Sequence, residues 1–234
     1  MTSKRSLLLA SFLSLTGAAL AWVPKLDEPT TKAVIDTAYD RALEPVRTFL
    51  TLDLSVKDGR FAAGDGVVQP YGAGNDACVQ AWLQDPAAYA RAGSRPVSVT
   101  LTGQADEVFL QAQRARDEFR NLSVQEALAP REGRLPDGHL RVYVQIAGLA
   151  AEKLRDAYML ALRGPDGKLT QPYRRAFTND WQRTEAGHWT GSMVYYFDAA
   201  KAGIDPNGKL ALLLRTEADT NCAYQFTADL GTFR

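Results

Sequence analysis

The stretch HWTGSMVYYFDA at residues 188–199 decides the fold, because its side chains alternate in character along the chain. One side of an extended chain would carry the apolar set Trp189, Met193, Tyr195 and Phe197. The other side would carry Thr190, Ser192, Val194 and Tyr196. A period of two over a short segment is typical of a strand in an antiparallel sheet with one dry face.

Similar segments follow one another from Gly138 to Arg234. They are HLRVYVQIAG at 139–148, DAYMLALR at 156–163, QPYRRAFT at 171–178, KLALLLRT at 209–216 and CAYQFTADL at 222–230. Gly-Pro-Asp-Gly at 164–167 and Asp-Pro-Asn-Gly at 205–208 are turn signals between them. This pattern predicts an immunoglobulin-like antiparallel β-sandwich over residues 138–234 and a mainly β protein.

The region before the sandwich, residues 22–130, is of mixed character. Apolar residues at three- and four-residue intervals predict a helix: Val34, Ile35, Ala38, Ala42 and Val46. Thr30 or Thr31 would be its N-cap, and Pro45 should end or kink it. Alternation predicts strands at 50–56 and 97–101, and charged residues favour a helix over a strand at 108–119. Prolines and glycines between 129 and 138 mark the expected domain boundary.

The strand at Leu210–Leu214 is apolar at every position. Such strands are usually covered on both faces, whereas a sandwich interior covers one. We therefore expect Leu213 to be buried on the outside of its sheet, either by the N-terminal α+β region or by a partner. The first alternative predicts one integrated body.

The first 21 residues have the features of a secretory signal peptide. Lys4 and Arg5 precede an apolar run at 7–15, and Ala19-Leu20-Ala21 supplies small residues for cleavage. The apolar run is shorter than the roughly 20 residues of a membrane span, so no membrane anchor is expected after cleavage. We expect a secreted or periplasmic protein that begins near Trp22.

The charge balance argues against a nucleic-acid or anionic-membrane partner. The chain has 27 basic and 27 acidic residues, and the segment 1–21 contains Lys4 and Arg5 but no acidic residue. The remaining chain therefore carries 25 basic and 27 acidic residues, a net charge of −2. Neither partner is expected without a clustered positive field.

The two cysteines, Cys78 and Cys222, are expected to form a disulfide, since export sends the chain to an oxidising compartment. Zinc sites draw closely spaced Cys and His ligands, and the chain has only His139 and His188 with no such spacing. No metal and no cofactor is therefore expected. Nucleotide-binding and serine-hydrolase signatures are also missing, so catalysis is not the leading expectation.

Four aromatic side chains fall outside the clean inward sets: Tyr143, Tyr173, Trp181 and Tyr196. On a sandwich face they could stack on sugar rings or anchor a protein. The leading expectation is a non-catalytic binding or structural module of the cell envelope or exterior, with a protein or glycan partner. The alternative is a carbohydrate-active protein, either a sugar-binding module or a glycoside hydrolase that uses loop carboxylates: Asp58, Asp65, Asp76, Asp205, Glu217 and Asp219.

Overall fold

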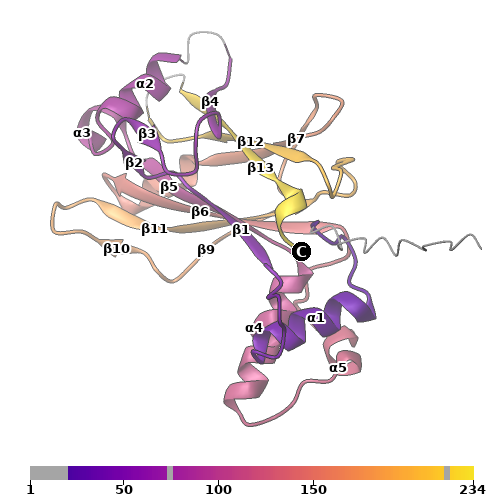
Figure 1. Ribbon diagram of the computed structural model, residues 1–234. Helices are drawn as coiled ribbons and strands as arrows, with labels where there is room; N and C mark the ends of the chain where they lie inside the picture. Colours follow the sequence, from indigo (N-terminus) through magenta and orange to yellow (C-terminus); the bar gives the residue numbers. More distant parts are fainter. Residues whose placement is uncertain (1–20, 73–75, 219–221) are drawn as a thin grey trace, which may run out of the picture.

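The alternating segments form two antiparallel sheets that lie one above the other (Figure 1). The computed structural model describes residues 21–72, 76–218 and 222–234, so residues 1–20 of the predicted signal peptide (1–21) and Asp219 lie outside the described residues. The protein is strand-rich with antiparallel sheets, which confirms the mainly β prediction.

The six-stranded sheet has the order β1-β5-β6-β11-β10, with β9 also paired to β11. Its strands are β1 (Phe49–Asp53), β5 (Arg95–Thr102), β6 (His139–Leu149), β9 (Arg174–Phe177), β10 (Gln182–Arg183) and β11 (Trp189–Asp198). The five-stranded sheet has the order β4-β13-β12-β7-β8. Its strands are β4 (Val68–Pro70), β7 (Met159–Arg163), β8 (Leu169–Thr170), β12 (Lys209–Arg215) and β13 (Ala223–Asp229). A small hairpin joins β2 (Val56–Lys57) to β3 (Arg60–Phe61).

Strands from both halves of the chain enter both sheets. From the N-terminal region, β1 and β5 extend the six-stranded sheet beside β6, and β4 pairs with β13 in the five-stranded sheet. The N-terminal region therefore does more than pack against a finished sandwich. The division of the chain near residue 138 stays a prediction.

The inner faces of the two sheets share one apolar core. Buried side chains of both sheets meet there, among them Val142, Tyr195 and Phe197 from one sheet and Leu212 and Phe226 from the other. In β11 the inward residues are the apolar set predicted from the alternation, which fixes the outward set on the opposite face. Burial of these inward side chains is the main favourable contribution to folding.

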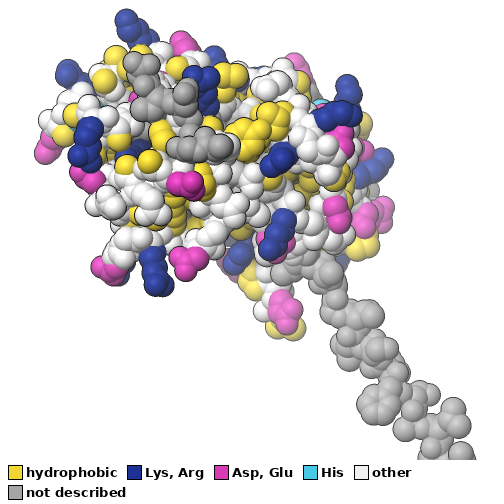
Figure 2. Space-filling view, turned by 90° about the horizontal axis from the view of Figure 1, so that it is seen from above, with side chains coloured by type: hydrophobic (Ala, Val, Ile, Leu, Met, Phe, Trp, Pro, Cys, Tyr) yellow, Lys and Arg dark blue, Asp and Glu magenta, His cyan; other side chains and the backbone are white. Residues whose placement is uncertain are grey.

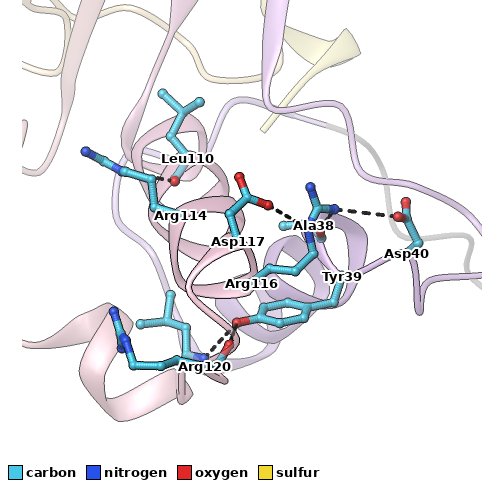
Figure 3. Close-up of polar contacts among 9 residues, drawn as sticks. Ala38, Tyr39, Asp40, Leu110, Arg114, Arg116, Asp117 and Arg120 are labelled. Carbon is cyan, nitrogen blue, oxygen red and sulfur yellow. Dashed lines mark hydrogen bonds and ion pairs between the residues drawn. The ribbon is translucent and has the colours of Figure 1, made fainter.

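Three helices pack together at one end of the sandwich (Figure 1). They are α1 (Glu28–Ala38), α4 (Gln104–Asp117) and α5 (Val124–Leu128), and they enclose a second apolar cluster. At the carboxyl ends of α1 and α4, the Arg116 guanidinium donates to the Ala38 carbonyl at 2.7 Å, and the Tyr39 hydroxyl donates to the Arg120 carbonyl at 2.7 Å (Figure 3). These contacts hold α1 and α4 side by side.

The predicted boundaries of α1 are wrong at both ends. The Asp27 carboxylate accepts from the Thr30 backbone N–H at 2.8 Å, so Asp27 is the N-cap and both threonines lie in the first turn. Proline in the first turn makes that start favourable, because its missing N–H would have no helical partner there. The helix ends at Ala38, well before Pro45.

The disulfide between Cys78 and Cys222 is confirmed, with a Cα–Cα distance of 5.8 Å. Cys78 belongs to α2 (Asp76–Gln84), and Cys222 directly precedes β13. On the same helix, Trp82 packs edge to face against Phe61 and Tyr224, with ring centres 4.9 Å and 5.1 Å apart. The short helix α3 (Tyr89–Ala92) follows and leads into β5. Two 3₁₀ turns, Glu152–Ala157 and Leu230–Thr232, complete the elements.

Leu213 is buried, as predicted from the apolar run, with 6% of its surface exposed. Its neighbours Leu212 and Leu214 belong to the sandwich core, whereas Leu213 faces the other way and belongs to neither apolar cluster. The helices α1, α4 and α5 pack in the second apolar cluster, which does not include Leu213. A hollow lies beside Leu213 on the outer face of its sheet, and Tyr71 from the N-terminal half is one of its lining residues. The outer face of this sheet is therefore not covered by the helical cluster.

Candidate functional site

Three of the four predicted aromatic residues meet on the outer face of the six-stranded sheet. Tyr196 lies in register between Arg141 of β6 and Arg174 of β9. The guanidinium carbons of these arginines are 5.4 Å and 5.0 Å from the centre of the Tyr196 ring. Cations at such distances are attracted to an aromatic ring. Tyr196 is thus fixed between two positive charges.

Tyr143 joins this group through Arg141, whose Nη1 donates to the Tyr143 hydroxyl at 3.3 Å. Arg141 also forms an ion pair with Glu107 of α4, and both side chains are largely buried. An ion pair shielded from water is screened less by salt than a surface pair. The first turn of α4 therefore positions the arginine that orders two of the tyrosines.

Tyr173 stands at the edge of the same face, with its ring 6.2 Å from the Tyr196 ring. It is 53% exposed, and its hydroxyl lies 3.0 Å from Nδ1 of His139. The other imidazole nitrogen, Nε2, lies 3.8 Å from the Asp198 carboxylate. Partial burial, and then the neighbouring Tyr196, raise the pKa of Tyr173 above its ordinary value. At neutral pH the phenol is therefore protonated and can donate a hydrogen bond.

A hollow of about 360 Å³ opens beside this edge, and we call it the His139 hollow. Its lining residues are His139, Thr170, Gln171, Tyr173, Asp198, Lys201 and Ala202. The lining combines one aromatic ring with hydroxyl, amide, imidazole, carboxylate and ammonium groups. Ligand sites typically place a few polar groups of this kind around a concave surface.

Trp181 does not belong to this group. Its ring packs over Gly191, where an added Cβ would come within 2.4 Å of the indole. The indole Nε1 donates to the Ser192 carbonyl at 3.2 Å, and the ring borders the sandwich core. Glycine at position 191 gives the ring the space that it occupies. The contacts of Trp181 are therefore those of a packing residue at the end of the core.

The sequence did not single out His139, Asp198, Arg141 or Arg174 as partners of the tyrosines. Their assembly depends on the pairing of β11 with both β6 and β9, a register that one sequence does not give. The sequence positions of His139 and Asp198 did contain a signal that could have predicted their proximity. His139 begins β6 and Asp198 ends β11, and antiparallel neighbours bring such positions together.

A second polar cluster lies inside the molecule, at the start of β5. The Ser94 hydroxyl is 2.5 Å from the Tyr158 hydroxyl and donates to the Glu217 carboxylate at 2.6 Å. Tyr158 is fully buried, and burial raises its pKa well above the ordinary value. Since solvent does not reach Tyr158, we assign this cluster to the interior structure and not to a ligand site.

Two of the loop carboxylates expected for a hydrolase, Glu217 and Asp205, form local hydrogen bonds. Glu217 is held by Ser94, and the Asp205 carboxylate accepts from the Asn207 backbone N–H at 2.9 Å within its own turn. Within the described ranges no three His, Cys, Asp or Glu side chains cluster closely enough to hold a metal ion. No helix of these ranges is long and apolar enough to cross a membrane.

Comparisons with known proteins give no relative for this chain. No protein-family model matches it, and neither a curated protein nor a solved structure shows significant similarity. The class of protein therefore has to be inferred from the sandwich, the disulfide and the two outer faces.

Proposed function

We propose that the chain is an exported, non-catalytic binding module of the cell envelope or exterior. Its binding surface is the tyrosine face, which we define as Tyr143, Tyr173, Tyr196, Arg141 and Arg174 together with the His139 hollow. The partner is a protein or a glycan. One observation carries the proposal: exposed Tyr173 and the cation-flanked Tyr196 adjoin a polar hollow.

Export is supported by two features. The Cys78–Cys222 disulfide is of a kind that persists in oxidising compartments. Trp22, directly after the expected cleavage position at Ala21, is 1% exposed and belongs to the core. Cleavage there would keep every core residue of the described ranges.

We further propose that the sandwich is immunoglobulin-like. Two face-to-face antiparallel sheets with one shared core support this assignment. The disulfide has a different position from the inter-sheet bridge of antibody domains, since it ties a helix to the start of β13. The helices at one end are additions to such a fold.

Binding is favoured over catalysis by the groups in the hollow. A glycosidase needs a pair of carboxylates about 5–10 Å apart. The lining of the His139 hollow includes Asp198 as its carboxylate, and the neighbouring His139 and Tyr173 are hydrogen-bonded to each other. These groups suit recognition of hydroxyl and carboxylate groups on a ligand.

Sugar binding is the second candidate, and the composition of the hollow favours it. Tyr173 offers an exposed ring face for stacking, and Gln171, Thr170 and Asp198 can hydrogen-bond to sugar hydroxyls. Lys201 adds a positive charge, which would favour an acidic sugar such as a uronate.

The test compares variants of the exported protein as bait for envelope extract and for a panel of neutral and acidic polysaccharides. We expect Tyr173→Ala and Tyr196→Ala to lose the partner that the unaltered protein retains. Phe119→Ala is the matched control, because Phe119 is a fully exposed aromatic residue that follows α4. Undiminished capture by Tyr173→Ala and Tyr196→Ala would contradict the assignment of the face. Retention of acidic polysaccharides alone would select the sugar-binding candidate.

A further inference from the structure

The outer face of the five-stranded sheet carries a second hollow, of about 310 Å³, which we call the Leu213 hollow. Cross-strand pairing places its outward residues in rows, with Leu213 opposite Ala161 and Arg215 opposite Met159. Figure 2 looks onto this side of the molecule and shows hydrophobic side chains at the surface between Lys and Arg side chains. The Leu213 hollow and the His139 hollow meet at Gln171, which lines both of them.

The rim of the Leu213 hollow carries exposed apolar side chains. Met159 and Leu169 line it and are 54% and 45% exposed. Large apolar side chains are common singly at surfaces, but here two of them flank a buried leucine in a concavity. The gathering of exposed apolar side chains around one concavity is the feature on which we base an interaction site.

The charges beside the hollow are positive. Arg215 lines it, and among the described residues no hydrogen bond or ion pair engages the Arg215 guanidinium. The nearby Arg163 does not line the hollow; it donates to Gln225 at 3.4 Å and lies 6.0 Å from the ring of Tyr71. Among the described residues that line the hollow, Arg215 is thus the one with a charged side chain.

We propose that the Leu213 hollow binds the acyl chain of a long-chain carboxylate, with the carboxylate against Arg215. The apolar lining would take methylene groups, and a guanidinium pairs with a carboxylate through two parallel hydrogen bonds. The one guanidinium in the described lining, that of Arg215, matches a single negative charge better than the higher charge of a phosphate monoester. The ligand class is therefore that of fatty acids.

The test measures displacement of the fluorescent probe dansyl-undecanoate from the full exported chain by octanoate, decanoate and dodecanoate, each below its micelle concentration. We expect saturable displacement that tightens by about two- to fourfold for each added methylene. Dodecanol, which lacks the charge, should bind about three- to fivefold more weakly than dodecanoate, the range of an exposed ion pair.

Two variants test the residues of the site. Leu169→Asp should weaken dodecanoate about tenfold or more, because it places a negative charge on the apolar rim. Arg215→Gln should weaken dodecanoate about three- to fivefold and leave dodecanol unchanged. Both side chains are exposed, so both variants should fold. The matched controls are Leu43→Asp and Arg131→Gln, which change exposed residues outside the hollow and should bind like the unaltered protein.

Three results would overturn the proposal. The first is the lack of saturable displacement, and the second is equal affinity in Leu169→Asp. The third is a dimer of the unaltered chain in size-exclusion chromatography that Leu169→Asp converts to monomer, since a second copy would then occupy the hollow. Tighter binding of dodecyl phosphate than of dodecanoate would overturn the choice of a carboxylate.

Discussion

The two outer faces of the sandwich are built from opposite kinds of side chain. The outer face of the six-stranded sheet carries tyrosines held by arginines, with a polar hollow at its edge. The outer face of the five-stranded sheet carries Leu213 beneath an apolar rim, with Arg215 at the edge of the hollow. Both sheets use the same alternation to build the shared core, so their outward positions are free to specialise. We propose that the two faces are two binding surfaces on one scaffold, which meet at Gln171.

The disulfide should have the largest effect on this arrangement, because it fastens α2 to the five-stranded sheet. The bonded cysteines are 144 residues apart, and the chain-entropy model gives about 5 kcal/mol of stabilisation for a loop of that length. Cys78→Ala combined with Cys222→Ala should lower the urea midpoint accordingly. Hydrogen exchange should show β4 and β13 losing protection before β6 and β11. Equal loss in both sheets would show that the bond stabilises the whole body uniformly.

A pair of neighbouring leucines compares the core with the outer face directly. Leu212→Ala should cost about 3 kcal/mol, since it leaves a cavity among fully buried side chains. Leu213→Ala should cost about 1 kcal/mol, because a side chain beside a hollow has packing partners on fewer sides. Urea unfolding of both variants measures the difference. Equal costs would mean that Leu213 is a core residue and that its outer face is not open.

The sequence predicted the strands well and the site only in part. Alternation in 188–199 identified which side chains enter the core, and the apolar run at 210–214 correctly indicated burial of Leu213. It did not give the register that places Tyr196 between Arg141 and Arg174, because cross-strand partners depend on pairing between distant segments. It also grouped Trp181 with the surface aromatics, since the space over Gly191 appears only after β11 is placed.

Trp181 and Tyr173 should therefore respond in opposite ways to truncation. Trp181→Ala should lower stability by about 2 kcal/mol, because a half-buried ring leaves the edge of the core, and it should leave partner capture unchanged. Tyr173→Ala should change stability by less than about 0.5 kcal/mol, as expected for an exposed residue, and should abolish capture. Thermal melts and the capture assay are run on both variants. Loss of capture by Trp181→Ala at a temperature where it is folded would extend the binding surface to the indole.

Alkaline pH should lower the stability of the protein through its buried tyrosines. Burial raises the pKa of Tyr195 and of Tyr158 above the ordinary value near 10, while in the unfolded chain both ionise near 10. Above that pH the unfolded state binds fewer protons than the folded state, so the free energy of unfolding falls as pH rises. The contribution of these tyrosines to stability is fully present only below pH 10. Tyr195→Phe should reduce the loss between pH 10 and 11 by about 1 kcal/mol, measured by urea unfolding at each pH. An unchanged pH slope would show that Tyr195 is solvated.

Hydroxyl-radical footprinting of the protein with its captured envelope partner can show whether the tyrosine face and the Leu213 hollow bind their ligands separately. Tyr173 and Met159 are both about half exposed in the isolated chain, so both should be oxidised there. With the partner bound, we expect Tyr173 and Tyr196 to be protected while Met159 stays reactive. Addition of dodecanoate should protect Met159 and leave Tyr173 reactive. Protection of Met159 by the partner, with Tyr173 still oxidised, would show that the partner binds at the Leu213 hollow and not at the tyrosine face.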